Sequence, residues 1–444
     1  MSMRRIIIIA YFFPPILESG TFRILKLIKY LPRFGYSSTV VAPGRTGAAE
    51  AGYAERFAYD PRGVRRAPDT TAHGLSEFLR ARRRARRKTD AGSAAGGEPP
   101  RRGSLPGRLR KFAKTWLFMP DAYISWLPMA LITALRACRA SGGDIILSTS
   151  NPISIHLTAL LLKRVTGKPW IADFRDLFAG NPYRDYNSPL RDRIDGIIER
   201  MVLKRADLVT VVSEPLREAI LEHNIAELAE KVHVLPNGFD PDSLRKEEEE
   251  GFDTFTIAYT GTFYQGKRDP KGVLEAISRL IDCGKVDPDR LRFRIAAPID
   301  DYALSLREKY PLDGVVQWLG IIPPEESIAL QRASSLLVLI IWDSVETRGE
   351  FSAKLFEYMA ARRPILAIVP PGDVAARAIE ETGTGMVIDP RDERGIERAI
   401  ADRYRLFYKA GGAESLPGTE ALEPYSWATR LEELCRVIDR YELP

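Results

Sequence analysis

The sequence contains few of the residues that build disulfide frameworks or metal centres. Its 444 residues include three cysteines and four histidines. Cys138, Cys283 and Cys435 lie far apart and are odd in number, so neither a disulfide framework nor a CxxC site is indicated. Nowhere do His, Cys and carboxylate residues share the spacing of metal ligands. Two Asp-Pro-Asp triplets, at 240–242 and 287–289, predict turns because of their central proline. We therefore expect a cytoplasmic protein without a bound metal.

Long apolar runs are also missing. No uninterrupted apolar stretch reaches the roughly 20 residues that a membrane-spanning helix needs. Residues 1–13 resemble a signal peptide, since Arg4 and Arg5 precede a short apolar run. Pro14 and Pro15, however, follow where a cleavage site would need small residues. We interpret this stretch as a buried first strand and expect a soluble or peripheral protein.

Positive charge is concentrated in one segment. The net charge is +6, yet residues 80–114 alone contribute +11, from 13 Lys or Arg against Asp90 and Glu98, and the remainder is −5. Gly, Ser, Ala and Pro make this segment typical of a flexible insert. We favour contact with an anionic membrane surface on the inner face of the cell membrane, and a solvated loop is the alternative. Stacking aromatics are scarce, so nucleic acid is not expected.

Continuous runs of β-branched and other apolar residues recur along the rest of the chain. Such runs, separated by amphipathic stretches, are typical of parallel α/β sheets, whose strands are buried on both faces. The pattern begins afresh after an acidic stretch at 247–250, which predicts two doubly wound domains, 1–240 and 251–425. A final helix, within 426–444, is expected to pack back across the junction. The predicted strands are 5–10, 38–42, 144–148, 170–173, 208–212, 232–235, 255–259, 292–296, 315–318, 335–340, 364–368 and 385–388.

Ligands of open α/β sheets bind at the carboxyl ends of strands, so the loops that follow the strands are candidate sites. The first strand leads into a helix that contains Gly20 and Arg23. Gly20 would let backbone amides approach an anion, and Arg23 would add positive charge. There is no GxGxxG or Walker sequence, and a helix cap by Ser19 or Thr21 explains the same loop.

Two further loops of the first half carry polar side chains. Asn151 and His156 follow one predicted strand, and Asp173, Arg175 and Asp176 end the next. Two carboxylates and a guanidinium at the open edge of a sheet predict that a carboxylate acts as a base while Asn151 and Arg175 position an acceptor. His156 is a further candidate catalytic residue at the same edge. The alternatives are a structural role for His156 and an Arg–Asp pair that holds the loop.

In the second half, cations and glycines follow the strand 255–259. Gly261 and Thr262 come first, and Lys267 and Arg268 follow them. Glycines permit close backbone approach and the cations can neutralise a diphosphate, which makes this loop a candidate phosphate site. The alternative is a surface turn with solvated charges.

A helix is predicted over residues 351–360, whose apolar positions 351, 355, 356 and 359 share one face. Ser352 stands at its start, where unpaired amides could meet an anion. Lys354 and Glu357 are three residues apart and therefore project from the same side. The alternative to a ligand site is a surface ion pair.

The order of these motifs resembles the GT-B glycosyltransferases of family 4, and particularly a bacterial subgroup with Asp-Phe-Arg-Asp and Lys-Leu-Phe-Glu-Tyr-Met-Ala motifs. The resemblance covers nearly the whole chain, and its motifs are weak singly but strong together and in order. They comprise residues 10–15, 120–126, 148–156, 170–176, 212–214, 235–240, 259–270 and 354–360 with Pro364.

The resemblance implies two Rossmann-like domains that face each other across a cleft, with the nucleotide on the C-terminal domain and the acceptor on the N-terminal one. It also implies retaining, metal-independent transfer from a nucleotide diphosphate sugar to a saccharide or lipid-linked acceptor, in cell-surface polysaccharide or glycolipid assembly. By the same analogy Glu357 binds ribose hydroxyls and the amides near Ser352 and Lys354 contact the diphosphate. Gly20 faces the same phosphates.

The sequence departs from the family pattern at two places. Many members have a glutamate eight residues before the second one, where this chain has Gly349. Glu350 is therefore a candidate catalytic residue if the loop register shifts by one. The usual Gly-Arg is Gly261-Thr262 here, which moves the diphosphate cation to Lys267, Arg268 or Lys271. Two other functions stay open: a catalytically degenerate scaffold of the same fold, and a sugar-nucleotide epimerase.

Overall fold

The computed structural model describes residues 3–16, 18–44, 54–55, 59–71, 119–181, 188–223, 226–244, 252–342, 351–410 and 418–441. The basic segment 80–114, Gly349 and the candidate Glu350 lie outside these residues. The chain divides into two compact units. The first comprises Met1–Val211, Arg217–Val234 and Leu434–Pro444, and the second comprises Val212–Leu216 and Leu235–Glu433.

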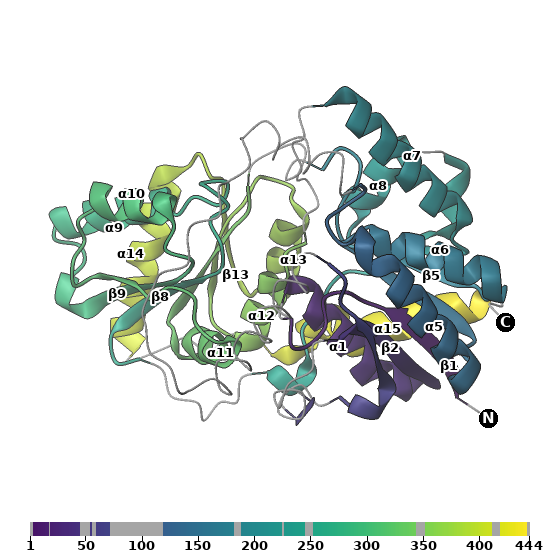
Figure 1. Cartoon of the computed structure of the whole chain (residues 1–444). Coiled ribbons are helices and arrows are strands. Elements are labelled where there is room, and N and C mark those ends of the chain that lie inside the picture. The colour runs from purple at the N-terminus through teal and green to yellow at the C-terminus, as the bar shows by residue number, and fades with distance from the viewer. Residues whose placement is uncertain are drawn as a thin grey trace, which may run out of the picture. The chain divides into compact units, whose positions relative to one another are not determined.

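The first unit is built on a seven-stranded sheet in the order β3-β2-β1-β4-β5-β6-β7, with every pair of neighbours parallel (Figure 1). Four successive isoleucines, residues 6–9, bury β1 on both faces beyond its two half-buried arginines, as its central place requires. The chain turns in opposite directions after β1 and β4, so their carboxyl ends mark the switch point where such sheets bind ligands. The strands are β1 Arg4–Ile9, β2 Tyr36–Gly44, β3 Val64–Pro68, β4 Ile145–Ser150, β5 Trp170–Phe174, β6 Leu208–Val211 and β7 Val232–Val234.

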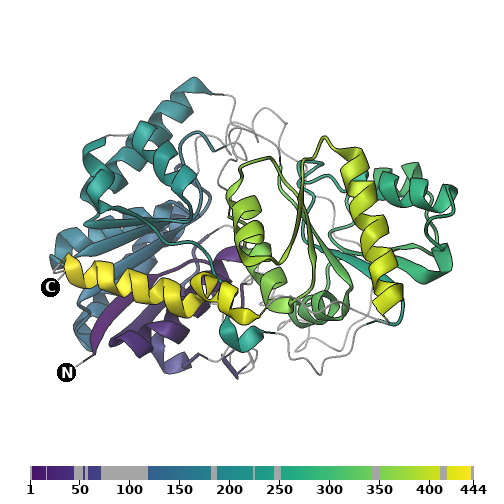
Figure 2. The same ribbon diagram turned by 180° about the vertical axis from the view of Figure 1, so that it is seen from behind.

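Helices pack on this sheet, and α5 and α6 contact each other as well as the strands. Their bounds are α1 Ser19–Tyr30, α5 Leu127–Ser141, α6 Ser154–Thr166, α7 Pro189–Arg205 and α8 Glu214–His223. Helix α15, Trp427–Arg440, adds its last residues to the first unit (Figure 2). There Tyr36 donates a hydrogen bond to Asp439 at 2.5 Å, and His233 Nε2 lies 3.1 Å from the Tyr441 hydroxyl. Both halves of the sequence therefore contribute to this unit.

The second unit contains a six-stranded parallel sheet in the order β10-β9-β8-β11-β12-β13. Its strands are β8 Phe255–Thr260, β9 Leu291–Ala296, β10 Val316–Trp318, β11 Leu336–Ile340, β12 Ile365–Ile368 and β13 Gly385–Ile388. Its helices are α9 Lys271–Asp282, α10 Asp301–Lys309, α11 Pro324–Ala333, α12 Ala353–Ala361, α13 Val374–Thr382 and α14 Glu393–Ala410.

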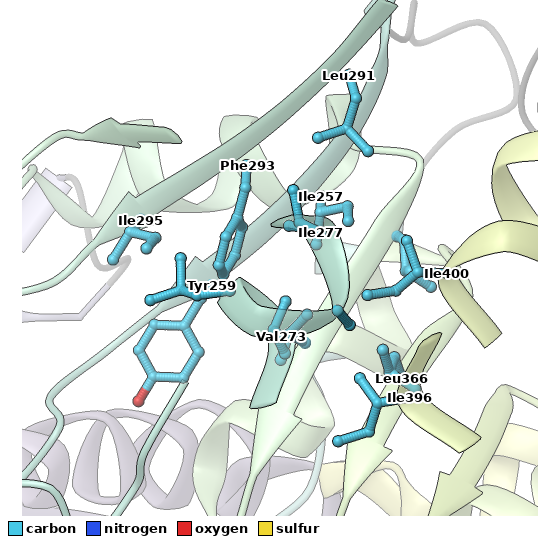
Figure 3. Close-up of a cluster of buried hydrophobic side chains, with 14 of the residues drawn as sticks. Ile257, Tyr259, Val273, Ile277, Leu291, Phe293, Ile295, Leu366, Ile396 and Ile400 are labelled. Atoms are coloured by element: carbon cyan, nitrogen blue, oxygen red, sulfur yellow. The ribbon is translucent and has the colours of Figure 1, made fainter. Parts of the chain in front are cut away.

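The two faces of the second sheet are covered by two separate apolar clusters. Alternate strand residues point to opposite faces, so Ile257 and Tyr259 join one cluster while Ala258 joins the other. Figure 3 shows the first cluster, in which Val273 of α9 and Ile400 of α14 pack on the strands. The second cluster is formed with residues of α12 and α13. This helix–sheet–helix layering confirms the predicted fold of two Rossmann-like domains.

Every predicted strand coincides with an observed strand to within two residues at each end. One observed strand, β3, was not predicted from the sequence. Among the helices of the described residues, none combines the length and the apolar character needed to cross a membrane.

Candidate functional site

The carboxylate of Asp173, at the end of β5, is the centre of a buried network in the first unit. Its Oδ2 accepts hydrogen bonds from Arg23 Nε at 2.9 Å and Thr149 Oγ1 at 2.8 Å. Its Oδ1 accepts from Arg23 Nη2 and Thr210 Oγ1, both at 2.7 Å. Burial acts to raise the pKa of Asp173, but the charge of Arg23 and these hydrogen bonds outweigh it and lower that pKa. Asp173 is therefore an ionised carboxylate whose acceptor positions are occupied.

This geometry corrects two sequence-based assignments. Asp173 is 1% exposed and fully engaged, so it does not fit the predicted role of a base. Arg23 is buried as well and its guanidinium is directed at Asp173, so it does not fit the role of a phosphate ligand. The structure favours the alternative of an Arg–Asp pair that holds the loop, but the arginine is Arg23 of α1 rather than Arg175.

His156 is also a structural residue. Its side chain is 0% exposed, and Nδ1 lies 2.7 Å from Ser148 Oγ. Trp170 Nε1 donates a hydrogen bond to the same Ser148 oxygen at 2.7 Å. The imidazole ring packs beside Phe174, with centroids 4.7 Å apart. Burial lowers the pKa of His156 to about 3, so the ring is neutral at pH 7. The predicted catalytic role is not supported, and the structural alternative is.

Arg175 fills the space that a side chain at Gly20 would need. A Cβ at Gly20 would lie 2.5 Å from Arg175 Nη1 and 2.6 Å from Cζ. The same guanidinium donates to the carbonyls of Ser150 and Asn151, and Asn151 Nδ2 donates to Asp176 at 3.1 Å. Four predicted residues thus lie together at the carboxyl ends of β1, β4 and β5. Of the candidate carboxylates here, Asp176 is the one that is exposed.

Sequence analysis missed the residue that fixes the loop after Asp176. Glu199 of α7 is buried and accepts hydrogen bonds from the backbone N–H groups of Phe178 at 3.1 Å and Ala179 at 2.9 Å. A glutamate inside a charged helix gives no sequence signal of this inward position, because the pairing amides come from a distant loop. Glu199 therefore ties α7 to the loop that presents Asp176 and Arg175.

In the second unit, Lys354 occupies the space above Gly261. Gly261 follows β8 with φ at +142°, a conformation that favours glycine. A Cβ at this position would lie only 1.4 Å from Lys354 Nζ. The ammonium group also lies 4.9 Å from the centroid of the Tyr259 ring. The missing side chain of Gly261 therefore makes room for a cation at the carboxyl end of β8.

Helix α12 is fastened to the same strand end. The Tyr358 hydroxyl accepts the backbone N–H of Thr260 at 3.1 Å. Gln331 of α11 donates to Thr260 Oγ1 at 3.1 Å and to Glu357 Oε2 at 3.4 Å. Glu357 is exposed, and the side chain of the N-cap residue Ser352 makes no capping hydrogen bond. Gln331 and Tyr358 were not predicted as site residues. Gln331 stands outside every motif, and Tyr358 is part of the apolar sequence of the helix.

The remaining candidates of this unit lie on the turn after β8. Thr262 is half-buried and its carbonyl accepts the Tyr259 hydroxyl at 3.1 Å. Arg268 is buried, with Cζ 4.8 Å from the Tyr264 ring centroid. Lys267 is half-buried and its Nζ lies 4.3 Å from the centroid of Trp342. Lys267 is therefore more accessible than Arg268.

The described residues contain no group of three or more His, Cys, Asp or Glu side chains that could hold a metal ion. The Asp-Pro-Asp triplets form the predicted turns. In each, the first aspartate caps a short 3₁₀ helix by accepting the N–H two residues on, at 3.0 Å for Asp240 and 2.9 Å for Asp287.

Two family models match successive parts of the chain. The model of Glycosyltransferase Family 4 matches residues 91–243, and that of Glycosyl transferases group 1 matches residues 254–405. Together they span more than half of the sequence. No curated protein sequence matches the chain.

Solved structures of the same fold cover nearly the full length of the chain. Sucrose-phosphate synthase from Thermosynechococcus elongatus is 15% identical, with a TM-score of 0.61 and 98% of each chain covered. A putative UDP-N-acetylglucosamine 2-epimerase from Listeria monocytogenes is 12% identical, with a TM-score of 0.53, and covers 99% of this chain and 97% of its own. The S. aureus MnaA–UDP structure is 14% identical, with a TM-score of 0.51, and covers 100% and 98%. At these identities the likeness shows the fold alone.

Proposed function

Because the chain belongs to the GT-B glycosyltransferases that combine a family 4 domain with a group 1 domain, we propose that it transfers a sugar from a nucleotide diphosphate sugar to a hydroxyl of a saccharide or lipid-linked acceptor. The second unit binds the donor and the first unit binds the acceptor. The anomeric configuration is retained, no metal takes part, and the product enters cell-surface polysaccharide or glycolipid. The likeness to a structure that holds UDP supports a nucleotide ligand.

The observation that carries this proposal is the arrangement of Gly261, Lys354 and Glu357. Lys354 brings a positive charge to the end of β8, where Gly261 leaves room for its ammonium group because it has no side chain. The first amides of α12 add their partial positive charge at the same helix end. Glu357, one turn further along, is exposed and offers a carboxylate to the ribose hydroxyls. In a nucleoside diphosphate the negatively charged diphosphate adjoins the ribose hydroxyls, just as Lys354 adjoins Glu357 on α12.

The same groups supply the chemistry of transfer. The acceptor hydroxyl attacks the anomeric carbon on the face from which the diphosphate departs, so one C–O bond forms as the other breaks and the hydroxyl proton passes to the leaving phosphate. Negative charge therefore builds on the diphosphate. Lys354 and Lys267 neutralise it, together with the amides of α12, as a metal ion does in other transferases.

On the acceptor side, we assign Asp176 the contact with the acceptor hydroxyl. Its carboxylate is exposed, and Asn151 and the loop held by Glu199 fix its place. Gly20 and Arg175 pack against each other at the carboxyl ends of the same strands. Asp173 and Arg23 act through this loop as positioning residues.

The test is thermal stabilisation of the full chain by a panel of nucleoside diphosphates and nucleotide sugars. A ligand at a hundred times its Kd stabilises the native state by about 2.7 kcal/mol, which raises the melting temperature. We expect one nucleotide series to stabilise the wild type and Glu357→Ala to abolish the effect. Glu326→Gln, an exposed glutamate of α11, is the control and keeps it. If no nucleotide stabilises the wild type, the proposal is wrong and the non-catalytic scaffold is favoured.

Product analysis separates transfer from epimerisation. The fold is shared with a putative epimerase, which needs no acceptor to act on its nucleotide sugar. We expect the donor identified by stabilisation to remain unchanged without an acceptor and to release nucleoside diphosphate when acceptor extract is added. Conversion of the donor into its epimer in the absence of acceptor would support the epimerase instead. The anomeric signal of the product in proton NMR tests retention.

A further inference from the structure

Helix α7 of the first unit, labelled in Figure 1, carries exposed apolar and basic side chains. Leu190 is 58% exposed and Ile197 is 67% exposed. Arg193, Arg200 and Lys204 are exposed too, and their spacing of three and four residues places them on the same face. These five residues are called the α7 face below. Exposed large apolar side chains beside a row of cations suit a surface that contacts the headgroup region of a bilayer.

The acidic residues of α7 are directed away from this face. Asp195 is buried in an ion pair with Arg191 at 2.8 Å, and Glu199 is buried against the loop after β5. Asp192 is exposed but lies about 140° around the helix from Ile197. The acidic side chains of the helix are therefore separated from its exposed cations, and none of its own carboxylates stands among the cations of the α7 face.

A basic pocket of about 640 Å³ adjoins the C-terminal end of the α7 face. Lys204 belongs to both, and Arg164 and Arg205 line the pocket with exposed side chains. The carboxylate of Asp207 is bound by Lys163 at 2.6 Å, so it neutralises that lysine rather than the arginines. Among the described residues that line it, the pocket therefore has room and an excess of positive charge for a phosphate group.

From these two observations we propose that the α7 face and the adjoining basic pocket form a docking surface for an anionic lipid bilayer. Leu190 and Ile197 enter the boundary between headgroups and acyl chains, while the cations contact lipid phosphates and extend their stems over the apolar surface. The pocket accommodates one headgroup phosphate. A nucleic acid would match the charge but not the exposed leucine and isoleucine, which offer no surface for base stacking.

The inference goes beyond sugar transfer and does not depend on it, since docking requires no turnover. It also differs from the contact expected through residues 80–114, which lie outside the described residues. The two surfaces can be separated because the α7 face lies on an ordered helix whose side chains can be replaced individually.

The test is cosedimentation of the full chain with vesicles of phosphatidylcholine alone and with phosphatidylglycerol added, at low and high salt. We expect binding only to the anionic vesicles and weaker binding at high salt. Each cation removed, in Arg193→Gln, Lys204→Gln or Arg164→Gln, weakens binding about fivefold. Ile197→Glu weakens it at least about tenfold, because a carboxylate would be pushed into the interface. The control is Ile321→Glu, an 82% exposed isoleucine of the second unit, which binds as the wild type does.

Three outcomes would overturn the proposal. The first is wild-type binding by Ile197→Glu and by all three cation variants. In the second, binding is lost only when Arg82, Arg83 and Arg84 of the basic segment are replaced by glutamine. The third is binding to duplex DNA but not to vesicles. Because Ile197, Arg193, Lys204 and Arg164 are exposed, circular dichroism of their variants is expected to match the wild type, which separates lost docking from lost folding.

Discussion

At the carboxyl end of β5, the charge of Asp173 depends on its partners within the first unit. Replacing it as Asp173→Asn leaves the guanidinium of Arg23 buried without a counter-charge. We expect the free energy of unfolding to fall by about 3–5 kcal/mol, measured by urea denaturation. Asp60→Asn is the matched control, because Asp60 pairs with Arg62 at an exposed site and such pairs contribute little to stability. Equal losses in the two variants would contradict this view of Asp173.

His156 makes stability depend on pH. Its pKa is 6.5 in an exposed setting and about 3 in the fold, so the unfolded chain binds a proton that the folded one does not. The stabilisation is complete above pH 6.5, and it declines by about 1.4 kcal/mol for each pH unit as the pH falls toward 3. Asp173, whose folded pKa is lowered, loses its own contribution only below its ordinary pKa of 3.8.

Denaturation of the wild type and His156→Gln between pH 4 and pH 7 measures this dependence. We expect the slope attributed to His156 to be absent from the variant, whatever its absolute stability. If the free energy of unfolding changed equally with pH in the two proteins, the imidazole of His156 would have the same pKa in the folded and the unfolded chain.

The donor site can be tested by adding a single methyl group at Gly261. In Gly261→Ala the new Cβ would displace the ammonium of Lys354, so we expect the Kd of the nucleotide to rise about tenfold or more, as when a charge-assisted hydrogen bond is lost. Gly320→Ala is the control, since Gly320 also has a positive φ of 72° but the nearest neighbour of its Cβ is 3.8 Å away. Calorimetric titration measures both. Equal affinity in both variants would argue against Lys354 as a diphosphate ligand.

The pairing of site residues was the part that sequence reasoning could not supply. Arg23 and Asp173 are 150 positions apart, and nothing in either neighbourhood indicates that they meet. Similarly, Gly20 and Gly261 were singled out as flexible loop residues, whereas their physical role is to leave room for Arg175 and Lys354. Residue type and strand-end position identified the candidates. Their roles depend on long-range packing.

At the level of elements, the loop after β7 packs closely on the segment that leads into α15. A Cβ at Gly238 would lie 2.8 Å from the carbonyl oxygen of Tyr425. We expect Gly238→Ala to lower the free energy of unfolding by about 1–3 kcal/mol, because backbone on both sides must shift. Gly196→Ala on α7 is the contrasting variant. Its Cβ meets no neighbouring atom within 4 Å, so it should stabilise the protein by about 0.5–1 kcal/mol. Urea denaturation measures the change in the free energy of unfolding for both variants. A stabilising effect of Gly238→Ala would show that the contact with Tyr425 has room for a methyl group.

Strands were predictable in proportion to their burial. β1, with its isoleucines, and β11, buried throughout, carry the continuous apolar runs that parallel sheets require. β3 is an edge strand with exposed positions, and the charge of Val-Arg-Arg-Ala-Pro makes it read as a loop. The other edge strands, β7, β10 and β13, contain no Lys, Arg, Asp or Glu and were predicted, so the two arginines of β3 rather than its edge position hid it from the sequence pattern.

For the molecule as a whole, the two units have separate cores, which predicts unfolding that departs from a two-state transition. We expect differential scanning calorimetry to resolve two components. A nucleotide that binds near Gly261 should raise the component of the second unit, and Asp173→Asn should lower that of the first. The alternative result is a single transition whose calorimetric and van't Hoff enthalpies agree and whose midpoint is shifted by the nucleotide and by Asp173→Asn. That result would show that the two units unfold together.

The order of the chain has a consequence for synthesis on the ribosome. All seven strands of the first sheet are complete by Val234, yet the helix turn that bears Asp439 and covers Tyr36 is translated roughly 200 residues later. At about 5–20 residues per second, the nascent first unit waits on the order of ten to forty seconds for that segment. During this interval the surface around Tyr36 is the part of the growing polypeptide that a cotranslational chaperone would shield.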